Sequence, residues 1–135
     1  MGTKEYLKQA FYLDKRIQTK TQELFQLRKT AGLLQAVNYD RPIVQGGTAG
    51  SGMDGVDKII SLEQEINREI DALLNLKQEI RQRIEKLENA DFRDVLTRRY
   101  ILFETWEQIA VDMHYTYRWI HKLHGRALSE FEKST

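Results

Sequence analysis

The sequence predicts an all-α protein, with a long antiparallel helical hairpin followed by a C-terminal three-helix domain that contains a helix-turn-helix. Apolar residues recur at steps of three and four through two long segments, which is typical of amphipathic helices. Residues 38–55, between these segments, hold the only proline and five of the eight glycines. No stretch alternates apolar and polar residues for long enough to suggest a sheet.

The first segment, residues 1–37, is expected to form one amphipathic helix over about 3–36. At about 1.5 Å per residue, such a helix is roughly 50 Å long. Lys20 interrupts its heptad-like apolar seam. The members of the seam are Tyr6, Ala10, Leu13, Ile17, Leu24, Leu27, Ala31 and Leu34.

Residues 38–55 are interpreted as a flexible Gly-rich linker, and residues 56–89 as a second long amphipathic helix. The apolar seam of this helix, which Lys77 interrupts, consists of Ile59, Leu62, Ile66, Ile70, Leu73, Ile80, Ile84 and Leu87. Two helices of similar length joined by such a linker can fold back as an antiparallel hairpin. Because a lone hairpin has a thin core, we expect a homo-oligomer, with a dimer favoured. Alternatively, the third segment covers the remaining apolar surface.

The third segment, residues 90–135, is expected to form short helices, each preceded by a residue that can cap it. The candidate caps are Asn89 or Asp91, then Thr105, and then Thr116. The helices are expected at about 91–103, from Thr105 through Met113, and from Thr116 to about Phe131.

The last two of these helices fit the spacing of a helix-turn-helix. The inward positions are taken by Ile109, Ala110, Met113, Tyr115, Ile120 and Leu123. His114 stands where the turn needs a left-handed residue, usually glycine. Histidine adopts that conformation more readily than most residues.

The outward side of the last helix is the part that enters the major groove in helix-turn-helix proteins. The residues expected to bind DNA there are Thr116, Tyr117, Arg118, His121, Lys122 and Arg126. Residues 116–128 contain no acidic side chain, although the net charge of the whole chain is only +1. A basic outward face can also be merely solvated, and three short helices can simply cap a coiled coil.

Further residues of the third segment match a known pattern. They are Leu96, Arg99–Tyr100, Trp106–Glu107–Gln108–Ile109–Ala110 and Arg126–Ala127–Leu128. With these residues, the stretch from about Phe92 to Phe131 resembles region four of bacterial sigma factors and their regulator relatives. The whole chain also resembles small phage and prophage proteins of this sigma-like regulator type, many of which form families of unknown function.

The resemblance implies a sequence-specific transcriptional regulator of phage or prophage type, which binds double-stranded DNA. The hairpin would oligomerise or dock a partner such as RNA polymerase. The residue types at 117, 118, 121 and 122 differ from those of primary sigma factors, so the same promoter element is not expected. Two alternatives remain: a small terminase-like DNA-packaging subunit, and an interaction module or inhibitor that uses the hairpin without binding DNA.

No catalytic constellation stands out, so we expect a protein that is not an enzyme and needs no cofactor. His121 and His124 are three residues apart, but a third metal ligand would have to come from His114 or Glu130, and we expect no metal site. The chain has no cysteine and no apolar run of the ~20 residues that span a bilayer. A cytoplasmic protein without a membrane partner is expected.

Overall fold

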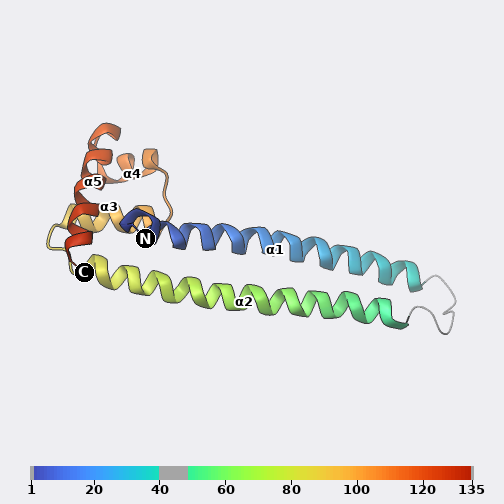
Figure 1. The fold of residues 1–135 in the computed structure, drawn as a ribbon. Helices are drawn as coiled ribbons and strands as arrows, with labels where there is room; N and C mark the ends of the chain where they lie inside the picture. Colours follow the sequence, from blue (N-terminus) through green and yellow to red (C-terminus); the bar gives the residue numbers. More distant parts are fainter. Residues whose placement is uncertain (1, 40–48, 135) are drawn as a thin grey trace. The chain divides into compact units, whose positions relative to one another are not determined.

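The computed structural model describes residues 2–39 and 49–134, except for the side chains of residues 33–39 and 49–54. Within these ranges it is all-helical, as predicted, with the order shown in Figure 1. The helices are α1 (Thr3–Tyr39), α2 (Ala49–Glu85), α3 (Ala90–Tyr100), α4 (Trp106–Met113) and α5 (Tyr117–Lys133).

The long helices extend further than the sequence predicted. The expected linker began at residue 38, but α1 continues to Tyr39, and α2 begins at Ala49 rather than at Val56. Each glycine in a helix costs ~1 kcal/mol relative to alanine, yet extending an existing helix is favourable at most residue types. Residues 40–48 of the expected linker, and the side chain of Leu34, lie outside the described residues.

The chain divides into two compact units whose boundaries differ from the expected segment boundaries. The hairpin unit comprises residues 15–71, which include most of α1 and the first part of α2. The head unit comprises residues 1–14 and 72–135, so it combines the start of α1 and the end of α2 with the three short helices.

The hairpin unit has a small core between α1 and α2. Leu24, Leu62 and Ile66 are buried there. Partly buried side chains extend this core on both helices, namely Ile17, Leu27 and Ile59. Such a core contains few fully buried side chains for two helices of this length, as expected for a two-helix hairpin.

In the hairpin unit, the side chain of Lys20, which interrupts the apolar seam of α1, reaches α2. Its Nζ lies 2.7 Å from Glu65 Oε1 and also contacts Glu69 Oε1. Arg16 approaches the same Glu69 carboxylate at 3.9 Å, and Arg28 forms an ion pair with Glu63. Ion pairs therefore link α1 to α2 in addition to the apolar core.

The head unit has a larger core, to which all five helices contribute. Leu7 and Ala10 of α1 are fully buried. The predicted apolar seam included Tyr6 rather than Leu7, and Tyr6 is only half-buried. The other buried apolar side chains of this unit are Leu73, Ile80, Ile84, Leu87, Val95, Leu96, Tyr100, Ile101, Ile109, Ala110, Ile120, Leu123, Ala127 and Phe131.

The connection between α3 and α4 is fixed by Phe103, which has a left-handed backbone conformation with φ 59°. A bulky residue adopts this conformation only under constraint. The Phe103 ring packs edge-on against Phe11 of α1, with ring centroids 5.8 Å apart. Lys77 of α2, which interrupts the second apolar seam, places its Nζ 4.4 Å from the centroid of the Phe103 ring. Packing within the head unit thus holds the strained residue.

Candidate nucleic-acid interface

The turn between α4 and α5 has the geometry that the sequence predicted. His114 has φ 59° and ψ 39°, in the left-handed region. Its N–H donates to Val111 O, and the N–H of Tyr115 donates to Ala110 O at 3.1 Å. This pair of hydrogen bonds is a Schellman motif, which ends α4 and redirects the chain. Histidine therefore serves where glycine is usual.

Threonine side chains cap both helices of the motif, as predicted. The Thr105 hydroxyl accepts from the backbone N–H of Gln108 at 3.2 Å, at the start of α4. The Thr116 hydroxyl accepts from the N–H of Trp119 at 3.1 Å, at the start of α5. Each cap satisfies one of the free N–H groups in the first turn and so fixes where its helix begins.

Four of the six predicted core positions of the helix-turn-helix are buried. Ile109 and Ile120 are fully buried, and Ala110 and Leu123 nearly so. Met113 is only half-buried.

The prediction of Tyr115 as an inward position is wrong, because 38% of its surface is exposed. Its hydroxyl donates to the Asp91 carboxylate at 2.6 Å, and its ring packs edge-on against Trp119. The phenol oxygen favours this polar partner at the surface over burial without one.

All six residues predicted to bind DNA are exposed, and they lie at the start of α5 or along it. Arg118 and Lys122 stand one helical turn apart, and neither has an ion-pair partner among the residues that the structure describes. The Arg126 guanidinium lies 5.2 Å from the centroid of the Trp119 ring. The Thr116 hydroxyl is engaged in the helix cap. Arg118 and Lys122 are therefore the side chains in the first turns of α5 that carry a charge without an ion-pair partner among the described residues.

Tyr117 and His121 belong to an aromatic array that continues onto α4. The His121 ring lies between Tyr117 and Trp106, with centroid distances of 4.5 and 4.8 Å. The Arg99 guanidinium lies 4.3 Å from the centroid of the Trp106 ring. Packing restricts the orientations of Tyr117 and His121, so that the surface they present is partly preorganised.

His124, which entered the sequence analysis only as a candidate metal ligand, is buried. Only 6% of its surface is exposed, and its Nε2 lies 2.6 Å from the Tyr100 hydroxyl oxygen. Burial, reinforced by the positive charges of Lys4 and Arg99, lowers the pKa of His124 to about 4. Burial also raises the pKa of Tyr100 to about 12. Both side chains are therefore neutral near pH 7, and they share a hydrogen bond whose donor is set by the tautomer of His124.

Arg98 joins α3 to α4 and to the connection between them. Its guanidinium lies 3.0 Å from Asp94, 3.3 Å from Glu104 and 3.2 Å from Asp112. Burial, together with the nearby Asp112 carboxylate, raises the pKa of Glu104. The Arg98 charge offsets this effect and fixes α4 relative to α3, and it thereby supports the helix-turn-helix.

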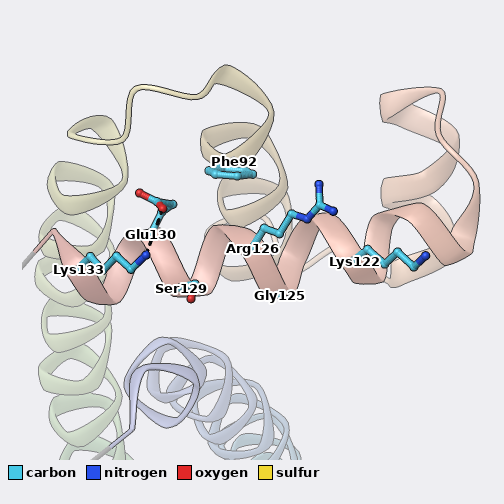
Figure 2. A pocket seen from close by; sticks show the side chains of 7 residues that line it. All are labelled: Phe92, Lys122, Gly125, Arg126, Ser129, Glu130 and Lys133. Carbon is cyan, nitrogen blue, oxygen red and sulfur yellow. Dashed lines mark ion pairs between the residues drawn. The ribbon is translucent and has the colours of Figure 1, made fainter.

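An open groove of about 520 Å³ runs along the outward side of α5, next to Phe92 of α3 (Figure 2). Lys122 and Arg126 line one end of it, and Glu130 and Lys133 form an ion pair at 3.7 Å at the other end. Gly125 lies on the groove, and a Cβ there would meet no atom within 4 Å. The backbone of α5 is consequently accessible at this point.

Three residues that support the site were not recognised from the sequence as members of it: Arg98, Arg99 and His124. His124 follows Ile120 by four residues and therefore shares its buried face, a signal that periodicity contained. The partners of Arg98 and Arg99 depend on how α3 packs against α4, and periodicity does not indicate this. Within residues 2–39 and 49–134, no three side chains gather as a metal site would require.

The chain was compared with protein-family models, with curated proteins and with solved structures. No curated protein and no solved structure matches it. No helix in the described part of the chain is long and apolar enough to cross a membrane. One family model matches residues 33–132, which cover the end of α1, all of α2 and the three short helices except the last residue of α5. The chain therefore belongs to the family described as "protein of unknown function (DUF1492)".

Proposed function

We propose that this protein is a sequence-specific DNA-binding regulator of transcription, of phage or prophage type, that reads duplex DNA with α5. In this proposal the hairpin oligomerises or docks a partner such as RNA polymerase, and the protein carries out no catalysis. The observation that carries the proposal is the basic, exposed face of α5, held by a capped helix-turn-helix turn.

The arrangement of the first turns of α5 supports this reading. Arg118 and Lys122 are free cations on the side of α5 opposite the buried Ile120 and Leu123. Helix-turn-helix proteins use this side of the second helix to reach base edges in the major groove. Arginine and lysine donate there to guanine O6 and N7.

Other residues of the site suit the phosphate backbone. Phosphate oxygens accept hydrogen bonds from basic side chains and from N–H groups at helix starts. Arg126 and the start of α5 at Thr116 offer both kinds of donor. The sigma-region-four resemblance of residues 92–131 favours the same assignment, with Tyr117 and His121 also on the DNA side.

The test is binding of the purified full-length chain to a random duplex library at moderate salt, followed by affinity measurement on the selected sequence. We expect a recovered motif and an affinity that falls as salt rises. Arg118→Ala and Lys122→Ala should each weaken binding by roughly 5- to 150-fold, which corresponds to about 1–3 kcal/mol. Helicity and oligomer size should stay unchanged.

Lys58→Ala is the matched control, because it removes one exposed cation from the hairpin unit. If both head variants bind like the wild type, α5 is not the recognition helix. If no sequence is enriched and no salt-sensitive binding occurs, the hairpin remains as the functional surface and the protein is an interaction module. If DNA binding occurs together with rings of eight or more copies, the packaging subunit is supported instead.

A further inference from the structure

The hairpin unit has two unlike sides flanking its core. On one side, Arg16 and Lys20 of α1 are held by Glu65 and Glu69 of α2, so the surface is charged and its ion pairs are formed. On the other side, one ion pair, Arg28–Glu63, joins the two helices.

Large apolar side chains surround the Arg28–Glu63 pair. Phe25 lies three residues before Arg28 on α1, and Ile60 lies three residues before Glu63 on α2, so each neighbours its ion-pair residue on the same helix face. Phe25 is 64% exposed and Ile60 46% exposed. Val56 and Ile70, each two turns from Glu63 along α2, are also exposed. We call these four side chains the open face. Large apolar side chains that are exposed together on one face can mark an interaction site.

The order of residues along α2 indicates what covers the open face. Ile60 and Ile70 are equidistant from Glu65, and so are Glu63 and Asn67. Between Ile60 and Ile70, this side of α2 therefore reads the same in both directions, apolar, polar, polar and apolar. A surface that is symmetric under reversal is complementary to an antiparallel copy of itself, as a two-fold interface requires.

We propose that a second copy of this chain covers the open face, with its α2 antiparallel to the first and a two-fold axis that crosses the open face at the level of residue 65. Ile60 then packs against the partner's Ile70, and Ile70 against the partner's Ile60. At the centre, the Asn67 amide donates to the partner's Glu63 carboxylate, whose charge Arg28 balances. The result is a four-helix arrangement of two hairpins.

The small core of the hairpin unit supports this occupant. Leu24, Leu62 and Ile66 are its only buried apolar side chains among the described residues. Four-helix bundles bury a second apolar stripe on each helix, which a lone hairpin leaves exposed. This inference rests on the oligomerising role of the hairpin in the proposed function, and it is independent of DNA binding.

The first experiment measures the molar mass of the full chain by light scattering. We expect twice the 15.9 kDa chain mass for the wild type and a single chain mass for the double variant Ile60→Glu, Ile70→Glu. Ser61→Glu adds a charge to an exposed position on a different face of α2 and should remain dimeric. A monomeric wild type, or a double variant that stays dimeric, would overturn the proposal. The latter result would assign the dimer to another surface.

The second experiment tests orientation and does not rely on charged variants. The chain has no cysteine of its own, so any disulfide that forms must join the introduced cysteines. A refolded mixture of Ile60→Cys and Ile70→Cys chains should form disulfide-linked heterodimers under oxidation, because a disulfide needs Cα atoms about 4.4–6.8 Å apart. Ile60→Cys alone should link poorly, since the two copies of position 60 lie roughly 15 Å apart along the axis. Efficient linking of Ile60→Cys to itself would show a parallel pair and refute the antiparallel one.

Discussion

The head unit and the hairpin unit use different means to hold their helices. In the head, fully buried side chains from all five helices meet, and caps fix where the short helices begin. In the hairpin, three buried side chains and a set of ion pairs hold two long helices. Stability in the head therefore depends on individual buried and capping residues. In the hairpin, it is distributed over contacts that are spaced along two long helices.

The largest effect is expected from a charge in the core of the head. Ile120 is fully buried, and Ile120→Asp would place a carboxylate without a partner among apolar side chains. We expect a loss of more than about 4 kcal/mol in the free energy of unfolding, enough to unfold the short helices. Thermal melting followed by circular dichroism measures this loss. The control is Val111→Asp on α4, which is 68% exposed and should melt almost like the wild type. A native melt for Ile120→Asp would contradict the burial of this residue.

The next largest effect is expected on the free energy of unfolding when the pH is lowered. It should be specific to the head because His124 lies there. Unfolding restores the ordinary pKa of about 6.5, whereas burial lowers the pKa to about 4 in the folded chain. The unfolded state therefore takes up a proton first as the pH falls. The free energy of unfolding should decrease from about pH 6.5 down to about pH 4, by up to ~3 kcal/mol.

Denaturant titrations of the wild type and of His124→Gln across this pH range measure the effect. The variant lacks the titrating ring, so its stability should change less between pH 6.5 and 4. Equal slopes for the two proteins would show that His124 is not the group responsible.

A smaller effect compares one residue type in the two units. The Thr116 hydroxyl caps α5 in the head, so Thr116→Ala should cost about 1 kcal/mol. The Thr21 hydroxyl, inside α1, donates to Ile17 O at 2.7 Å. Because such a bond does not help a helix interior, Thr21→Ala should be neutral or stabilising by a few tenths of a kcal/mol. Chemical denaturation gives both values. Equal losses would mean that the hairpin depends on its threonine as much as the head does.

The smallest effect is expected at the Lys20 ion pairs of the hairpin. Hydrogen bonds that the Lys20 ammonium donates to the Glu65 and Glu69 carboxylates raise the pKa of Lys20, so the ammonium form is favoured. Exposed ion pairs contribute little and weaken with salt. Lys20→Met should therefore melt slightly below the wild type at low salt, with the difference shrinking at high salt. A large loss that persists in high salt would show that these ion pairs, rather than apolar contacts, hold the hairpin.

Much of the fold was predictable because it follows from local rules. Periodicity indicated both long helices, and the caps at Asn89, Thr105 and Thr116 indicated the short ones. The left-handed His114 followed from its place in the motif. The early start of α2 was missed, because glycines were interpreted as linker residues while they lower helix propensity only moderately. The inclusion of residues 1–14 in the head unit was also missed, since it depends on contacts between distant segments.

The site was predicted less completely than the fold. Exposure of Arg118 and Lys122 followed from their phase relative to Ile120. Tyr115 was misplaced because its ring was weighed as apolar, and the hydroxyl that reaches Asp91 was not considered. The packing of Arg99 on Trp106 joins two helices, and no pattern within a single helix reports such a contact.

Tyr6 and Phe131 belong to opposite ends of the chain, yet their rings lie 6.5 Å apart in the head unit, with Arg83 over both. This contact has a consequence for the order of events during synthesis. Every residue of the hairpin unit has been added once residue 71 is made, whereas the contacts of the start of α1 are complete only after Phe131 has been added. Loop closure over such a separation slows folding. The unit proposed to read DNA would thus be the last to form, and its first helix would already be anchored in a hairpin.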